Sequence, residues 1–174
     1  AKGTILVADD KKEILESLKK MLKYDFSTVI TLSDPEKIPS AMEKHAVDLV
    51  LLDMNFSPGA TSGAEGLMWL GVILEMDPQA VVIPMTAFGD IDLAVRAIQA
   101  GGIDFIIKPW DPTKLMATIM AAYQLRQSRR EVKNLQDVRR MMDQDVSRRF
   151  DMLVGSSPEL EQLKEVSYKA AASD

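Results

Sequence analysis

Short apolar segments alternate with amphipathic segments along the first 124 residues of the chain. The clearest apolar segment is residues 47–55, where a run of branched apolar side chains ends in a polar turn, which is typical of a buried strand. The amphipathic segments have apolar residues every three or four positions, which is typical of one helix face. We predict strands at residues 4–8, 27–32, 47–55, 80–85 and 104–107, and helices at residues 11–23, 35–44, 67–76, 90–100 and from residue 111 onward.

Five successive β–α units predict an α/β fold with a parallel sheet and helices on both of its faces. Because crossover connections are right-handed, few topologies remain. We expect a flavodoxin-like (βα)5 doubly wound sheet with strand order 2-1-3-4-5, in which ligands bind beside strands 1 and 3. Pro84 lies inside the predicted fourth strand. Since proline cannot donate to a strand ladder, we expect it near a strand end or at a bulge.

Polar side chains follow the predicted strands where their carboxyl ends would meet. They are Asp9 and Asp10 after the first strand, Asp53 at the tip of the third, Thr86 after the fourth and Lys108 after the fifth. Clustered carboxylates repel each other unless a cation neutralises them, and an all-oxygen site favours Mg²⁺. A carboxylate, Mg²⁺, an ammonium and a hydroxyl together can accept a phosphoryl group. Taken singly, each residue also has an ordinary structural interpretation as a turn, strand or surface residue.

Composition narrows the possible chemistry. The chain has no cysteine and one histidine, which excludes disulfides, thiolate metal sites and multi-histidine metal centres. No apolar run approaches the ~20 residues of a membrane helix, and the chain starts directly in a strand-like segment, so we expect a cytoplasmic protein without a membrane partner. The net charge of -5 is uneven: residues 1–124 carry 11 Lys and Arg against 17 Asp and Glu, or -6, and residues 125–174 carry +1. This acidic excess disfavours direct nucleic-acid binding by that part.

The last 50 residues differ from the first 124. From residue 115 no strong helix breaker occurs before Gly155, and apolar residues close to a heptad pattern predict a helical linker at residues 125–149 that pairs with a second copy of the chain. The alternative is a linker whose apolar residues contact the preceding domain. Residues 150–155 are expected to be extended, and Ser157-Pro158 to start a helix of a further, truncated domain at residues 150–174. The predicted seam consists of Leu125, Val132, Leu135, Met142 and Val146 and is interrupted at Ser128, Arg139 and Arg149.

Four short motifs resemble the receiver domain of two-component response regulators, over about residues 3–123. They are Ile-Leu-Val-Ala-Asp-Asp at residues 5–10, Leu-Leu-Asp at 51–53, Met-Thr-Ala at 85–87 and Ile-Lys-Pro at 107–109. The resemblance implies that Asp53 accepts a phosphoryl group from a sensor histidine kinase. It implies further that Asp9, Asp10, Asp53 and the backbone carbonyl of Asn55 hold Mg²⁺.

The same resemblance assigns roles to three further residues. Lys108 would bind the phosphoryl group, with a cis peptide bond between Lys108 and Pro109. Thr86 and Phe105 would form a switch pair, in which the hydroxyl turns to the phosphoryl group and the ring rotates inward. The alternative for Phe105 is a core residue of the fifth strand.

The loop from Asp53 to Gly66 is about five residues longer than is usual in this family. We hypothesise that it covers the site and slows phosphorylation or dephosphorylation. Residues 150–158 are similar to the entry of the AAA+ ATPase domain in sigma-54-dependent transcription activators. The phosphate-binding Gly-rich loop of that domain is not among these 174 residues, so they cannot hydrolyse ATP. In the full-length protein, the resemblance implies DNA and sigma-54 RNA polymerase as partners and control of dimer or ring assembly by phosphorylation.

Two other functions fit parts of the pattern. A haloacid-dehalogenase-like phosphatase also uses a strand-end Asp with Mg²⁺, Thr and Lys. That chemistry needs a second Asp two residues after the first as general acid, and the chain has Asn55 there. A pseudo-receiver that only dimerises is the second alternative, and the complete set of polar residues argues against it.

Overall fold

The computed structural model describes residues 2–57, 59, 62–87 and 90–154, with side chains described up to residue 148. The residues divide into two compact units, Ala1–Arg129 and Arg130–Asp174. The strands are β1 (Lys2–Ala8), β2 (Phe26–Leu32), β3 (Val47–Asp53), β4 (Val82–Ala87) and β5 (Ile106–Lys108). The helices are α1 (Lys12–Leu22), the 3₁₀ helix η1 (Pro35–Lys37), α2 (Ile38–Lys44), α3 (Ala64–Met76), α4 (Ile91–Gln99) and α5 (Pro112–Val154).

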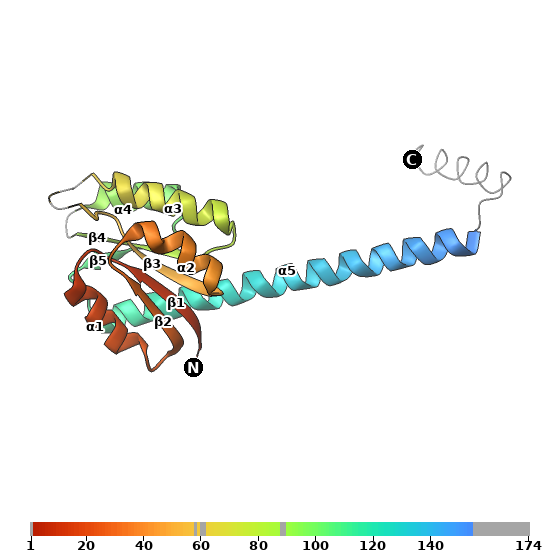
Figure 1. The fold of residues 1–174 in the computed structure, drawn as a ribbon, viewed down its shortest axis with the longest axis horizontal. Helices are drawn as coiled ribbons and strands as arrows, with labels where there is room; N and C mark the ends of the chain where they lie inside the picture. The colour runs from red at the N-terminus through yellow and green to blue at the C-terminus, as the bar shows by residue number, and fades with distance from the viewer. Residues whose placement is uncertain (1, 58, 60–61, 88–89, 155–174) are drawn as a thin grey trace. The chain divides into compact units, whose positions relative to one another are not determined.

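The first unit is a five-stranded parallel sheet in the order β2-β1-β3-β4-β5, with helices on both faces (Figure 1). The predicted flavodoxin-like order is therefore confirmed. Successive residues of β1 and β3 point to opposite faces of the sheet, which produces two cores. One core joins alternate residues of these strands to α1 and α5, and the other joins the remaining residues to α2 and α3. Because β1 and β3 are central and buried, their carboxyl ends are held rigidly.

The predicted second helix starts with a tighter turn than expected. The Asp34 side chain accepts a hydrogen bond from the Glu36 amide, as an N-cap should, but the first turn is the 3₁₀ helix η1 and the α-helix starts only at Ile38. The reason is Pro39, which has no amide hydrogen to close an α-helical turn back to Pro35. The amide of Ile38 closes a 3₁₀ turn onto the Pro35 carbonyl instead.

Pro84 is neither near a strand end nor at a bulge, so that expectation was wrong. It lies within β4 and is paired in register with Leu52 of β3. The Met85 carbonyl accepts a hydrogen bond from Met54, after β3, whereas the Val82 carbonyl accepts one from Ile103 on the other side. Alternation therefore directs the Pro84 nitrogen away from β3, toward the side where the β5 ladder has not yet begun. The strand tolerates proline because no ladder bond is required at that position.

Two other boundaries also differ from the predicted ones. The predicted fifth strand, residues 104–107, is observed at Ile106–Lys108, so Phe105 precedes it. The loop expected to reach Gly66 ends earlier, because α3 begins at Ala64.

Helix α5 ends later than the predicted linker. Its helical backbone continues through residues 150–154, which we expected to be extended, because no proline or glycine interrupts the chain there. The helix predicted at Ser157-Pro158 lies outside the described residues. Leu125, the first residue of the predicted seam, packs against the core of the first unit instead. The later seam residues Val132, Leu135, Met142 and Val146 are exposed. Among the described helices, none is both long and apolar enough to span a membrane.

Candidate functional site

Three carboxylates gather at the carboxyl ends of β1 and β3. Asp9 and Asp10 directly follow β1 and Asp53 is the last residue of β3, and ligand atoms of all three lie within 4.8 Å of one another. The strands are neighbours in the sheet, so their parallel register brings the three residues together. Asp9 is fully buried and Asp53 is 6% exposed. The sequence prediction that these carboxylates converge is confirmed.

Lys108 provides the positive charge of the cluster. Its Nζ atom lies 2.6 Å from Asp9 Oδ2 and 2.9 Å from Asp53 Oδ1, and its side chain is 15% exposed. Lys108 ends β5, which is held beside β4 and is followed by a cis peptide bond to Pro109, as expected. One ammonium therefore bridges two buried carboxylates from different strands.

Opposing effects act on the Asp53 carboxyl group. Burial raises its pKa above the ordinary value and the negative charge of Asp9 adds to that effect, whereas the Lys108 ammonium and the Met54 amide lower it. Burial is the largest cause, so the net pKa is raised. One Asp53 oxygen accepts hydrogen bonds from the Met54 amide at 2.8 Å and contacts Lys108. The carboxylate is thus oriented by backbone and side-chain donors together.

The donor set fits a divalent cation. Asp10 Oδ1 is buried and has no hydrogen-bond partner among the described residues, although it lies in a cluster of carboxylates. A buried carboxylate oxygen without a partner is costly unless a cation or donor satisfies it. Three carboxylates with one lysine leave excess negative charge, and hard oxygen ligands suit Mg²⁺. Asp9, Asp10 and Asp53 could therefore hold such an ion.

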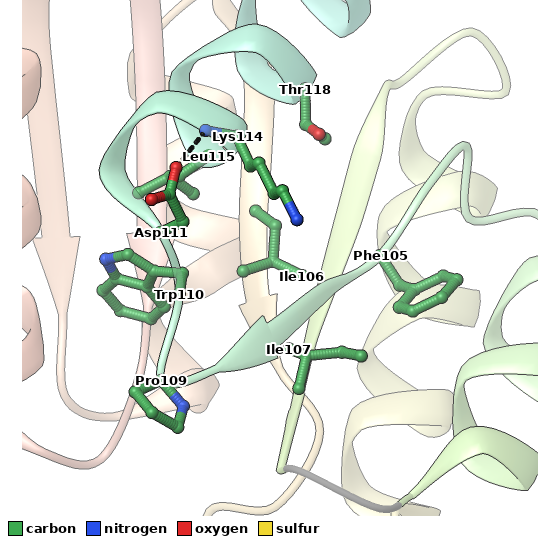
Figure 2. Close-up of a pocket in the computed structure, with 9 residues that line it drawn as sticks. All are labelled: Phe105, Ile106, Ile107, Pro109, Trp110, Asp111, Lys114, Leu115 and Thr118. Atoms are coloured by element: carbon green, nitrogen blue, oxygen red, sulfur yellow. Dashed lines mark hydrogen bonds between the residues drawn. The ribbon is translucent and has the colours of Figure 1, made fainter.

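Thr86 lies near the carboxyl end of β4, and Phe105 directly precedes the neighbouring strand β5, in which Ile107 is the register partner of Thr86. Thr86 is 1% exposed, and its hydroxyl has no hydrogen-bond partner among the described residues. Phe105 is 37% exposed and precedes β5, so it is not a buried core residue. In Figure 2 its ring lies at the opposite end of a pocket of about 440 Å³ from Trp110. The unpartnered Thr86 hydroxyl and the exposed Phe105 ring are each compatible with the role expected of them in a switch pair.

The segment after Asp53 is held by two side chains, only one of which the sequence singled out. The Asn55 side-chain oxygen accepts a hydrogen bond from the Gly63 amide at 2.9 Å. The Glu65 carboxylate, which sequence reasoning missed, accepts hydrogen bonds from the Phe56 amide, the Ser57 amide and the Ser57 hydroxyl. These bonds lower the pKa of Glu65, with the Ser57 hydroxyl as the largest cause. A Glu in the first turn of a helix is a familiar capping signal that could have revealed this contact.

Comparison with known proteins agrees with this geometry. Residues 5–120 match the model of the response regulator receiver domain. The chain belongs to this family. The receiver match covers β1 from Ile5 onward, the other four strands in full and the start of α5, and therefore every residue of the carboxylate cluster.

Similar curated proteins are transcriptional regulators. The chain is 30% identical over 172 residues to the alginate biosynthesis transcriptional regulatory protein AlgB of Pseudomonas aeruginosa, covering 99% of this chain and 36% of AlgB. It is 30% identical over 135 residues to the DNA-binding transcriptional regulator NtrC of Escherichia coli, covering 78% of this chain and 28% of NtrC. The chain thus spans about a third of the length of such relatives.

Solved structures confirm the receiver fold. The N-terminal receiver domain of a two-component response regulator from Bacteroides fragilis is 42% identical, with a TM-score of 0.64, and the match covers 71% of this chain and 98% of that one. NtrX from Brucella abortus is 28% identical, with a TM-score of 0.69, over 95% of this chain and 34% of NtrX. The similarity to NtrX extends into the segment after the receiver.

Proposed function

We propose that this receiver is the phosphorylation switch of a sigma-54-dependent transcription activator, with Asp53 as the residue that accepts the phosphoryl group. The single observation that carries this proposal is the contact of Lys108 with both Asp9 and Asp53 inside a cluster of three carboxylates. That arrangement supplies a nucleophile, a charge to bind phosphoryl oxygens and ligands for a metal. A sensor histidine kinase is the proposed donor.

The transfer step balances without a further co-reactant. A carboxylate oxygen of Asp53 attacks the phosphorus of a phosphohistidine, a new P–O bond forms, and the P–N bond to the imidazole breaks. The electron pair of the P–N bond stays on the ring nitrogen, and because the other ring nitrogen of the phosphohistidine already carries a proton, the histidine leaves as a neutral imidazole. Lys108 exchanges part of its contact with the Asp53 carboxylate for the transferred phosphoryl oxygens. The Met54 amide keeps the remaining carboxylate oxygen oriented during attack.

Asp9, Asp10 and Asp53 are the proposed ligands of Mg²⁺, with the backbone carbonyl of Asn55 as a further ligand. When bound, the ion offsets the negative charge that accumulates as a carboxylate meets a phosphoryl group. The partnerless oxygen of Asp10 supports this assignment.

Thr86 and Phe105 are the proposed switch. Support comes from the Thr86 hydroxyl, which is buried without a partner among the described side chains and is therefore available to a phosphoryl oxygen. Movement of Thr86 toward the site would leave space near β5 for the exposed Phe105 ring to turn inward. The polar change at Asp53 would then alter an apolar surface.

The output proposed for the whole protein is a change of dimer or ring assembly in a cytoplasmic activator that binds DNA and sigma-54 RNA polymerase. The similarity to AlgB and NtrC supports this part, and the exposed apolar residues of α5 after Arg129 support pairing with a second chain. A receiver domain, linker and ATPase entry at residues 1–124, 125–149 and 150–174 remains our proposed division.

The phosphatase and pseudo-receiver alternatives gain no support. Membership of the receiver family and Asn55 two residues after Asp53 disfavour a phosphatase. The intact carboxylate and lysine cluster disfavours a receiver without phosphoryl chemistry.

The proposal is tested with acetyl phosphate and Mg²⁺, using intact-mass spectrometry. The wild-type chain should gain the mass of one phosphoryl group, and chelation of Mg²⁺ should prevent the gain. Asp53→Asn should stay unmodified, whereas the matched change Asp104→Asn, at an exposed loop carboxylate, should behave as wild type. A phosphoryl adduct on Asp53→Asn would refute the assignment of the acceptor.

A further inference from the structure

A clamp of three residues attaches α5 to the turn between α3 and β4. Arg126 on α5 donates from Nη2 to Asp77 Oδ2 at 2.5 Å and from Nη1 to the Gln79 carbonyl at 2.6 Å. We call Arg126, Asp77 and Gln79 the turn clamp. Arg129, one helical turn later, adds longer contacts of 3.4 and 3.3 Å to the carbonyls of Gln79 and Ala80.

Hydrogen bonds within the turn hold the acceptors of the clamp in place independently of Arg126. Asp77 Oδ1 accepts a hydrogen bond from the Gln79 amide at 3.0 Å, and the Ala80 amide donates to the Asp77 carbonyl at 2.8 Å. The turn therefore presents one carboxylate oxygen and one carbonyl in a fixed arrangement. A planar guanidinium can bind both at once, and a lysine ammonium on a flexible stem cannot hold the same geometry.

Burial makes the turn clamp an unusual way to attach a helix. Arg126 is 7% exposed, and its Nε atom has no hydrogen-bond partner among the described residues. The Asp77 side chain is 32% exposed, so the ion pair is only partly buried and adds little to stability. Its contribution lies in the fixed geometry of the contact. The clamp therefore fixes where α5 lies along the turn more than how strongly it adheres.

The clamp connects α5 to β4, which carries Thr86, in addition to its chain connection to β5, which carries Lys108. Helix α5 starts soon after Lys108, at the end of β5, and the clamped turn leads into β4, which carries Thr86 near its other end. The helix is thus attached by its covalent start to one strand and by Arg126 to the other. A displacement of β4 relative to β5 would strain these two attachments, and a change in the direction of α5 would relieve that strain.

We propose that the turn clamp is the joint that transmits the state of Asp53 to the part of α5 that follows Arg129. The inference rests on the proposed phosphoacceptor function and names how that site is read out. With Arg126 in place, a change at Asp53 alters α5 on both sides of Arg129. Without Arg126, only the part of α5 before Arg129 changes, and the part after Arg129 does not respond to phosphorylation.

The test measures hydrogen exchange by mass spectrometry in the 174-residue chain, with and without acetyl phosphate and Mg²⁺. In the wild type, the phosphodonor should change exchange in peptides covering residues 127–145. In Arg126→Met this change should be lost while intact mass still shows the phosphoryl adduct. Arg140→Met, the same substitution at an exposed position of α5, is the matched control and should respond as wild type.

Arg126→Lys is the second variant, because it keeps a cation beside Asp77 and packs with little change in volume. Unchanged hydrogen exchange in α1 shows that a variant is folded. If Arg126→Met does not fold, the response of Arg126→Lys tests the proposal instead. If the peptides covering residues 127–145 respond equally in the wild type and in a folded Arg126 variant, the proposal that the turn clamp is the joint is wrong. An adduct without any linker response in the wild type overturns the joint alone, whereas a wild type that forms no adduct overturns the proposed function as well.

Discussion

At the scale of single residues, the site brings three carboxylates and one ammonium close together. The buried carboxylates of Asp9 and Asp53 share one ammonium, that of Lys108, and the unpaired oxygen of Asp10 adds to their negative charge. A site that accepts a phosphoryl group needs carboxylates close together, although the fold would be more stable with fewer of them. Lys108 is therefore expected to stabilise the fold, by neutralising buried carboxylates, as well as to bind the phosphoryl group.

Lys108→Met should lower the free energy of unfolding by about 3 kcal/mol, because two buried carboxylates lose their cation. Urea unfolding at neutral pH measures the loss, and Mg²⁺ should restore part of it by neutralising the same carboxylates. In an Asp53→Asn background, the cost of Lys108→Met should be smaller. An unchanged cost there would show that the ion pair at 2.9 Å has no energetic coupling.

Glu65 provides a residue-scale pH dependence. Its pKa lies below the ordinary 4.5 because the carboxylate accepts hydrogen bonds, mainly from Ser57. The bonds are complete above pH 4.5 and are lost as pH falls through the lowered pKa of the folded state. Amide shifts of Phe56 and Ser57 followed by NMR should therefore titrate with a midpoint below 4.5. Ser57→Ala should move the midpoint upward, and a wild-type midpoint at or above 4.5 would contradict the observed bonds.

Two glycines on α3 show how the elements of the fold are fitted together. Gly66 lies where a methyl group would overlap Met54 Cα and come within 2.8 Å of the Met54 carbonyl oxygen, whereas a methyl group at Gly71 would meet nothing within 4 Å. Met54 directly follows Asp53, so the close approach of α3 at Gly66 helps to position the end of β3.

Gly66→Ala should therefore lower the free energy of unfolding by about 1–3 kcal/mol, because backbone atoms must move apart. Gly71→Ala should raise it by up to about 1 kcal/mol, since alanine favours a helix more than glycine does. Thermal and urea unfolding of both variants measure the difference. If the two substitutions had effects of the same sign, the close packing of α3 on Met54 would not be limiting.

The elements were more predictable than their boundaries. Hydrophobic period and turn residues predicted all five strands, since these signals are local. The strand order followed from right-handed crossovers and the flavodoxin-like topology. Pro39 shortened α2 and Pro84 remained inside β4 for reasons that depend on neighbouring carbonyls and strands, which periodicity does not report. The site residues were predictable because parallel strands bring their ends together, but Arg126 was not, because its partners Asp77 and Gln79 are distant in sequence.

Assembly belongs to the scale of the whole molecule. Among the side chains described up to residue 148, the buried apolar residues of α5 are those that pack on the sheet, and the apolar residues after Arg129 are exposed. Such residues are not stabilised within the first unit, so we expect them to pair with a second chain. The first unit is acidic, so two copies of it repel each other, whereas the charges of α5 are mixed in sign. We therefore expect the pairing to involve α5 after Arg129.

Leu135→Asp should raise the dimer dissociation constant at least tenfold, because a charge replaces an apolar residue in the seam. Sedimentation equilibrium measures the constant, and Asn134→Asp, which adds the same charge at the preceding exposed position, is the control. Equal dissociation constants for the two variants would place the contact between chains elsewhere.

The three-residue length of β5 has a consequence for how this protein would fail. Lys108 is supplied by the shortest strand, at the margin of the sheet, and is supported by a neighbour on one side only. Edge strands open locally and exchange their amide hydrogens at a lower free energy than the central strands of a sheet. Under heat or denaturant, the proposed phosphoacceptor site would therefore lose Lys108 while most of the sheet was still folded, so loss of phosphorylation need not mean that the receiver has unfolded.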